Sequence, residues 1–407
     1  LPHSLSTAIN ELFSSANHSF AMYPGLSHGA LATIEAHGSK HQQEQFMPKL
    51  VEGSWTGTMC LTEPHCGTDL GMLRAKAELN DDGSYALTGT KIFISAGEHD
   101  LSENIVHIVI ARIPGSPAGN KGISLFIVPK FNVTEAGEKS DRNAVTCGSI
   151  EHKMGINANA TCVINFDGAK GYLIGEVNRG LNCMFTFMNA ARLGVAIEGV
   201  AAAEASFQGA LAYARDRLQM RSLSGPKNPD GPADPIIVHP DVRRMLLTQK
   251  SIAEGGRALT AYLSQLVDIG HASTCKAEKE NAEKQLALLT PIAKAFLTEL
   301  GLECTSHGVQ VFGGHGYIKE WGMEQLMRDT KISCIYEGTT GIQALDLLAR
   351  KILGSKGEIL KVFASDISKF CVENSKDVAM LEFIQPMMTF GTDWQKITEI
   401  IAQKALK

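Results

Sequence analysis

A single carboxylate, Glu337, lies between an apolar run and a Gly-Thr-Thr-Gly turn in CIYEGTTGIQALDLLAR, residues 334–350. The residues that follow it have the pattern of an Ala- and Leu-rich helix closing on Arg350. A carboxylate in this place is either a helix-start charge with no further role or a base made stronger by a dry pocket. From these residues alone, the helix-start charge is the simpler interpretation.

Two upstream segments have residue types that suit a bound anion or a planar ring. LTEPHCGTD, residues 61–69, offers the hydroxyls of Thr62 and Thr68 and a glycine that lets backbone N–H groups approach a ligand. KIFISAG, residues 91–97, would place Phe93 and Ser95 on one face of a strand. The same residues are also compatible with an ordinary turn and an ordinary half-buried strand. The ligand-binding and the purely structural interpretations both stay open.

Two further segments, one basic and one rich in glycine, are ambiguous by themselves. Arg215, Arg217 and Arg221 cluster where a long predicted helix ends, so they either complement the helix dipole or clamp a phosphate. The glycines of QVFGGHGYIKEWGMEQLMRD, residues 310–329, do not match GxGxxG, and a helix rather than a strand is expected before them. A Rossmann dinucleotide turn is therefore excluded.

The elements that must position these residues form successive blocks. Residues 1–57 read as helices, and residues 58–170 contain short β-branched segments without intervening helices, which predict an antiparallel β-barrel. Residues 171–350 contain long helices, the first of about 40 residues, and predict a four-helix bundle in which Pro291 starts a new helix. Residues 351–407 add a helical extension. This order predicts an α+β fold rather than βαβ alternation.

Composition excludes several classes of protein. The 407 residues are 44% hydrophobic with a net charge of −5, which excludes a disordered chain and argues against a nucleic-acid surface. The nine cysteines show neither CxxC pairs nor zinc-ligand spacing, so we expect a reducing, cytoplasmic setting and no metal. No apolar run is long enough to span a membrane. Helical patterns at both ends, and a first residue that is Leu, indicate a fragment of a longer chain.

The order of the motifs is more specific than any one of them. Thr-Glu-Pro-x-x-Gly-Thr-Asp, Lys-Ile-Phe-Ile-Ser, Gln-Val-x-Gly-Gly-x-Gly-Tyr and Tyr-Glu-Gly-Thr follow one another as in the acyl-CoA dehydrogenase family, which the chain resembles over about residues 20–350. Segments such as GISLFIVPKF and TCVINFDGAKGYLIGE resemble its 3-methylmercaptopropionyl-CoA dehydrogenase branch. The resemblance implies an N-terminal helical domain, a middle β-barrel and a C-terminal four-helix bundle. For this branch it implies short thioether acyl-CoAs of dimethylsulfoniopropionate breakdown as substrates.

The resemblance also implies FAD as cofactor, bound between barrel and bundle. The implied contacts to FAD in the same subunit are Leu61, Thr62, Thr68, Phe93, Ser95 and Thr339. Arg217, Gln310 and Gly314 are implied to contact the FAD of a neighbouring subunit, so at least a homodimer is expected. Met220-Arg221 and Gly341 depart from the usual family residues and weaken the transfer of the adenosine contacts.

By the same resemblance, Glu337 is the base that takes the α-proton of an acyl-CoA while a hydride leaves the β-carbon for flavin N5. The product is a trans-2-enoyl-CoA, and the implied substrate contacts are Arg192, Tyr336 and Gly338. One branch of the family carries its base at the position held here by Ala191, which cannot act as one.

The expected electron acceptor is an electron-transfer flavoprotein. Two alternatives remain open: a non-catalytic, DNA-associated flavin-binding homologue and an acyl-CoA oxidase. A salt-dependent gel shift would indicate the first, and rapid reoxidation of the reduced enzyme by O₂ would indicate the second.

Overall fold

The computed structural model describes residues 1–405, which begin with three helices. These are α1 (His3–Ala16), α2 (His18–His37) and α3 (Lys40–Glu52). A capping box starts α3, because the Ser39 side chain accepts from the N–H of Gln42 and the Gln42 side chain accepts from the N–H of Ser39. Helix α3 ends at Gly53, whose φ of 82° is a left-handed conformation that glycine adopts without strain. The chain then enters the sheet.

The sheet closes on itself. Its strands are β1 (Trp55–Cys60), β2 (Lys76–Leu79), β3 (Tyr85–Ser95), β4 (Asn104–Arg112), β5 (Ile123–Pro129), β8 (Val145–Ile150) and β9 (Thr161–Ile174). The order is β1-β4-β2-β3-β9-β5, β8 also pairs with β9, and β5 pairs again with β4 to complete a ring. Strands β6 (Phe131–Val133) and β7 (Lys139–Arg142) form a separate pair. The predicted barrel is confirmed.

Most strand pairs of the barrel are antiparallel, as expected, but two are not. Strands β1 and β2 both pair with β4 in parallel, β1 over residues 55–60 and β2 at Lys76 only. Parallel pairing requires a long crossover connection. The chain between β1 and β4, which includes β2 and β3, is long enough to return to the same end of the sheet.

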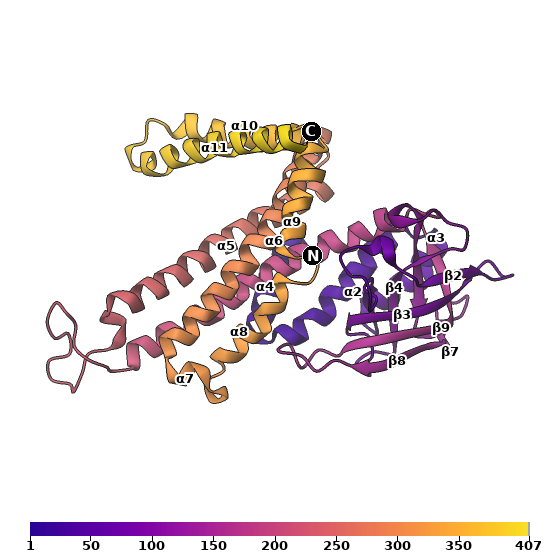
Figure 1. Ribbon diagram of the computed structural model, residues 1–407, viewed down its shortest axis with the longest axis horizontal. Coiled ribbons are helices and arrows are strands. Elements are labelled where there is room, and N and C mark those ends of the chain that lie inside the picture. The colour runs from indigo at the N-terminus through magenta and orange to yellow at the C-terminus, as the bar shows by residue number, and fades with distance from the viewer. Residues whose placement is uncertain (406–407) are drawn as a thin grey trace.

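Three long helices, α4 (Gly180–Asp216), α5 (Pro240–Ala272) and α6 (Lys276–Phe312), pack on one another in the C-terminal half. Two shorter helices, α8 (Met323–Lys331) and α9 (Thr340–Leu345), follow one another along α6 and take the fourth position of the bundle (Figure 1). Pro291 lies inside α6 instead of starting a helix. Leu288 and Ala293 are buried on either side of it, so packing of the continuous helix outweighs the lost backbone N–H.

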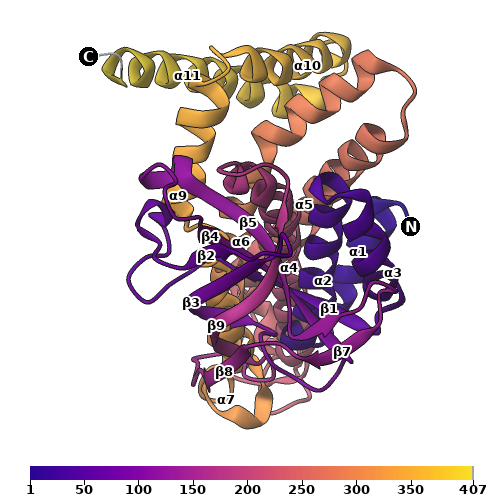
Figure 2. The ribbon, with the colours of Figure 1, turned by 90° about the vertical axis from the view of Figure 1, so that its right-hand side faces the viewer.

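After α9, a π-helical segment (Asp346–Leu353) leads to the hairpin of α10 (Glu358–Asn374) and α11 (Leu381–Ala405). This hairpin lies across one end of the bundle, while the short α7 (Gly314–Tyr317) lies at the other (Figure 1). Figure 2 looks onto the barrel, with α1, α2 and α3 along one of its sides. No helix within residues 1–405 is long and apolar enough to cross a membrane.

The barrel, α2 and α4 share one hydrophobic core. Ile34 of α2, Ile108 of β4 and Phe187 of α4 are all fully buried in it. A Cβ added to Gly29 of α2 would lie 2.4 Å from the Phe187 ring, so glycine is required where these two helices meet. This packing fixes α4 against the barrel and so sets the two sides of the candidate site relative to each other.

Candidate active site

Glu337 lies in the turn before α9, in a strained backbone conformation. Its φ is 55° and that of Gly338 is 93°, and positive values are uncommon for a residue other than glycine. Buried side chains hold the two carbonyl groups of this turn. Gln343 Nε2 donates to both of them, at 3.0 and 3.1 Å, and Lys294 Nζ donates to the Gly338 carbonyl at 2.8 Å. Arg192 Nε donates to the Glu337 carbonyl at 3.4 Å.

The carboxylate of Glu337 has a free oxygen in a dry place. Oε2 is inaccessible to solvent, and no residue from 1 to 405 forms a hydrogen bond with it. Burial raises the pKa of Glu337 to about 7; Glu198 acts in the same direction, while Arg192 and Lys294 oppose it. A carboxylate that titrates near neutral pH is suited to accept a proton from a weak carbon acid.

Arg192, expected at the CoA moiety, lies in the core behind this turn. Its Nη1 is 2.8 Å from Asp346 Oδ2, and the two side chains are only 2% and 3% exposed. The guanidinium therefore supports the turn that carries Glu337. Ala191, the residue before it on α4, has no side-chain group that could act as a base.

Tyr336 and Gly338, the other two expected substrate contacts, flank Glu337. The hydroxyl of Tyr336 donates a hydrogen bond to Glu198 of α4. Gly338 must be glycine, because an added Cβ would lie 2.8 Å from Gln343 Nε2 and its φ is positive. Both residues thus help to hold the turn that carries Glu337.

The loop after β1 is anchored by a buried ion pair. Lys91 Nζ donates to the Leu61 carbonyl at 2.9 Å and to Glu63 Oε1 at 2.8 Å. Glu63 also accepts from the backbone N–H groups of Arg74 and Ala75. Burial alone would raise the pKa of Glu63, but Lys91 and these N–H groups outweigh it and lower that pKa. The loop that carries Thr62 and Thr68 is therefore firmly held.

The strand with Phe93 and Ser95 is irregular. Lys91 pairs with Ile164 and Ile94 pairs with Cys162, so β3 has one more residue than β9 in this stretch. Phe93 has a φ of 59° and is 60% exposed. The bulge breaks the expected alternation, because Lys91 is buried although it would share a face with Phe93 in a regular strand. The bulge leaves the aromatic ring of Phe93 exposed to solvent.

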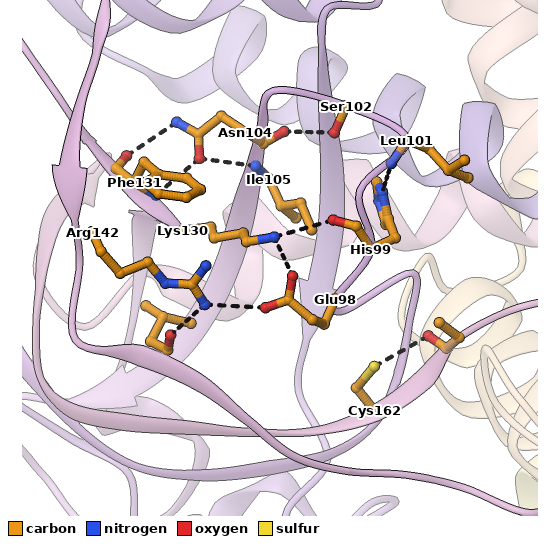
Figure 3. Close-up of polar contacts among 12 residues, drawn as sticks. Glu98, His99, Leu101, Ser102, Asn104, Ile105, Lys130, Phe131, Arg142 and Cys162 are labelled. Atoms are coloured by element: carbon orange, nitrogen blue, oxygen red, sulfur yellow. Dashed lines mark hydrogen bonds and ion pairs between the residues drawn. The ribbon is translucent and has the colours of Figure 1, made fainter.

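A polar network fixes the chain just beyond this strand. Figure 3 shows Lys130 and Arg142 reaching Glu98 from two different segments of the barrel domain. Lys130 Nζ also donates to the His99 carbonyl at 3.1 Å. Asn159 Oδ1 accepts from the backbone N–H of Ala96 at 3.1 Å. These contacts hold the end of β3 and so fix the direction in which Phe93 and Ser95 point.

The three residues expected at a neighbouring subunit's cofactor lie together, away from Glu337. Arg217, Gln310 and Gly314 are exposed where α4 and α6 end, and Tyr213 of α4 stacks on Phe312 of α6 at 4.2 Å. Lys294, which contacts the Glu337 turn, and Gln310 are 16 positions apart along α6, or about 24 Å at 1.5 Å per residue. The structure brings these residues together as a group of their own.

Thr339 is exposed at the start of α9, and Thr68 is exposed in the loop after β1. Among residues 1–405, neither threonine forms a hydrogen bond with the Glu337 carboxylate. The Thr62 carbonyl accepts from the N–H of Ile92 at 2.9 Å, which joins the loop after β1 to β3. The loop with the buried Leu61 and with Thr62 is therefore bonded to the strand that carries Phe93 and Ser95.

Lys91, Glu63 and Lys294 were missed as supporting residues. Glu63 and Lys91 stand inside the two barrel motifs, but their pairing joins positions 28 apart. Lys294 and Gly338 are 44 positions apart. The only signal in the sequence was a charged residue within an otherwise apolar segment, which is rarely buried without a partner.

The residues of the barrel side fit a planar cofactor with polar edges. Phe93 offers an exposed ring, and Ser95 pairs across the sheet with Thr161, whose buried Oγ1 has no hydrogen-bond partner within the described chain. A bound planar ring system could pack against the exposed ring of Phe93, and its polar edge could form a hydrogen bond with the unpaired hydroxyl of Thr161. The bundle side offers the carboxylate of Glu337 as the only acid in its turn.

Two family models match the chain. Residues 58–169 match the acyl-CoA dehydrogenase middle domain, and residues 178–353 match the acyl-CoA dehydrogenase C-terminal domain. An acyl-CoA dehydrogenase of Bacillus subtilis is 30% identical over 78% of this chain and 73% of its own length. The chain belongs to the acyl-CoA dehydrogenase family.

Within the acyl-CoA dehydrogenase family, the chain is similar to 3-methylmercaptopropionyl-CoA dehydrogenase of Ruegeria pomeroyi, with 47% identity over 94% of this chain. The alignment spans 65% of that relative's length. The fold is similar to the structure of an acyl-CoA dehydrogenase from Bacillus anthracis complexed with FAD, with a TM-score of 0.72 and 25% identity. That match covers 90% of this chain and 60% of the other.

Proposed function

We propose that the chain is an FAD-dependent acyl-CoA dehydrogenase in which Glu337 removes the α-proton. The observation that carries this proposal is the buried, unpaired Oε2 of Glu337, whose pKa burial raises to about 7. An α-proton of a thioester is a weak acid, and a desolvated carboxylate is a stronger base than one in water. FAD, when bound, supplies the acceptor for the hydride that leaves the β-carbon, and the product is a trans-2-enoyl-CoA.

The turn itself supplies a second group. Within residues 1–405 the backbone N–H of Glu337 donates to no acceptor. Negative charge builds up on the thioester oxygen as the α-proton leaves, and a preorganised N–H donor in a dry site stabilises it. We place this N–H at the thioester oxygen and Oε2 at the α-carbon. Lys294, Arg192 and Gln343 keep both groups in place by holding the carbonyls of the turn.

We assign FAD to the barrel surface formed by Leu61, Thr62, Thr68, Phe93 and Ser95, with Thr339 at its edge. Arg217, Gln310 and Gly314 would hold the distal part of the FAD of a second copy. Their grouping about 24 Å along α6 from the turn supports this assignment. The enzyme would then be a homodimer or a larger assembly, and an electron-transfer flavoprotein would take its electrons.

For the substrate we propose a short acyl-CoA such as 3-methylmercaptopropionyl-CoA. The support is the 47% identity to the Ruegeria pomeroyi enzyme of that name. The role would be in dimethylsulfoniopropionate degradation.

Anaerobic bleaching of the visible flavin band by a panel of acyl-CoAs tests this proposal. The methylthio compound and butyryl-CoA should bleach the wild type, and Glu337→Gln should retain the yellow cofactor but not bleach. Since Glu337 must be deprotonated to act, the rate should rise with pH through about 7. Undiminished bleaching of Glu337→Gln would remove Glu337 as the base, and rapid reoxidation by O₂ would indicate an oxidase instead.

A further inference from the structure

Glu198 of α4 is a largely buried carboxylate with no role in the reaction described above. Its side chain is 14% exposed, and its Oε2 lies 3.2 Å from Nε2 of His18 on α2. The same carboxylate accepts a hydrogen bond from the hydroxyl of Tyr336. Two helices and the turn before α9 therefore meet at this one side chain.

The position of this group suggests what it does. Tyr336 directly precedes Glu337, so Glu198 is bonded to the residue next to the proposed base. Glu198 makes no hydrogen bond to the Glu337 carboxylate itself. Any influence on Glu337 must therefore pass through space as charge, or through the backbone of Tyr336 as position.

The surrounding charges make the influence of Glu198 significant. Two buried cations, Arg192 of α4 and Lys294 of α6, face the Glu337 turn and favour an ionised carboxylate. Glu198 is the negative group that acts against them. The charge of Asp329 of α8 also raises the pKa of His18.

We propose that Glu198 is a positioning residue for Glu337, which ties down Tyr336 and whose negative charge keeps the neighbouring carboxylate ready to take a proton. His18 moderates this effect, because a protonated imidazole next to Glu198 cancels part of its charge. The inference rests on the proposed function only in calling Glu337 the base.

His18 is suited to this part. Burial alone would lower the pKa of His18, but the Glu198 carboxylate outweighs it, so the pKa is raised above its ordinary value. The imidazole therefore stays protonated to a higher pH than a free histidine does. Removing Glu198 and removing His18 should then shift the titration of Glu337 in opposite directions.

The test is the titration midpoint of Glu337, read from infrared difference spectra in which Glu337→Gln identifies the carboxyl band. The same midpoint is read from the pH profile of flavin bleaching. We expect Glu198→Gln, which still accepts from Tyr336, to lower the midpoint by roughly 0.5–1 pH unit, and His18→Gln to raise it by a smaller amount. The control is Glu204→Gln, because Glu204 lies on the same helix at 19% exposure, paired with Arg257 at 2.8 Å.

An unchanged midpoint in Glu198→Gln, or shifts of the same sign in both variants, would overturn the inference, since a purely structural defect has no reason to change sign. If Glu198→Gln does not fold, the upward shift in His18→Gln decides alone. The infrared reading needs no substrate. A wild type that no acyl-CoA bleaches would thus reject the proposed function while the role of Glu198 is still measured.

Discussion

Two carboxylates of the candidate site, Glu63 of the barrel and Glu337 of the bundle, are held in opposite ways. Glu63 of the barrel bonds to Lys91 at 2.8 Å, and the pKa of Glu63 is lowered in spite of burial. Glu337 of the bundle also has a buried lysine nearby, but Lys294 donates to the Gly338 carbonyl at 2.8 Å instead. Burial therefore raises the pKa of Glu337 to about 7.

The difference separates a structural carboxylate from a reactive one. The oxygens of Glu63 accept hydrogen bonds from the Lys91 ammonium group and from two backbone N–H groups. These donors stabilise the ionised carboxylate, so protonation of Glu63 is unfavourable. Glu337 keeps an oxygen without a partner, because the nearby cations donate their hydrogen bonds to the carbonyls of its turn and not to this oxygen. Both sides also use a left-handed residue, Phe93 with φ 59° and Glu337 with φ 55°, to aim a side chain.

The largest expected loss of stability comes from breaking the buried ion pair between Glu63 and Lys91. Glu63→Ala leaves Lys91 as an unpaired buried charge and should cost about 3–5 kcal/mol of unfolding free energy. Urea unfolding measures it. Glu78→Ala is the control, because Glu78 pairs with Lys76 on an exposed edge at 3.1 Å and should cost under about 1 kcal/mol. Equal losses for the two variants would contradict the structural role of Glu63.

Replacing Glu337, whose carboxylate has an unpaired oxygen, should stabilise the fold instead. The folded protein holds the Glu337 proton up to about pH 7, whereas the unfolded chain releases it near 4.5, so stability falls as the pH rises between these values. Glu337→Gln cannot ionise and should be more stable than the wild type by about 3 kcal/mol at pH 8, with little difference near pH 4.5. Melting temperatures at the two pH values measure this. A difference that does not change with pH would reject the raised pKa.

The turn that carries Glu337 should tolerate no side chain at its second residue. Gly338→Ala forces a Cβ to 2.8 Å from Gln343 Nε2 at a positive φ and should cost about 1–3 kcal/mol. Gly341→Ala is the matched control, since the nearest atom to an added Cβ, Thr339 Oγ1, lies at 3.9 Å, which is ordinary van der Waals contact. Melting curves that show equal losses for both would mean that the turn is not strained.

The smallest effect should come from the second lysine. Lys294→Met removes one hydrogen bond to a carbonyl that Gln343 also contacts, and should cost about 0.5–1.5 kcal/mol. Lys91→Met instead leaves Glu63 unpaired and should cost about 3–5 kcal/mol. Urea unfolding compares the two directly. A larger loss of unfolding free energy for Lys294→Met than for Lys91→Met would contradict this account, because it would make the bundle lysine the more important one for stability.

Motif reasoning can group neighbouring residues of the candidate site, because each motif is a short continuous segment. Tyr336, Glu337 and Gly338 are adjacent, and the β-branched segments that make the barrel are continuous. The helix α4 was expected from an uninterrupted stretch without proline and is observed over Gly180–Asp216. The residue pattern of a segment is enough to predict a helix or strand when that element depends mainly on its own residues.

What sequence reasoning missed depends on contacts between elements. The pairing of Glu63 with Lys91, and the burial of Arg192 behind the turn, arise only when strands and helices have packed. The bulge at Phe93 is a backbone choice that hydrophobic alternation does not reveal. Pro291 was read as a helix start, but its buried neighbours keep α6 continuous through it.

Proton exchange at the substrate α-carbon tests the role of Glu337 most directly. With the flavin held reduced, so that the hydride step cannot proceed, the enzyme is incubated with butyryl-CoA in D₂O and deuterium at the α-carbon is followed by mass spectrometry. We predict exchange in the wild type and a loss of about 10²–10⁴-fold in Glu337→Gln, with FAD still bound. Exchange at the wild-type rate in Glu337→Gln would contradict the assignment of the unpaired carboxylate as the base.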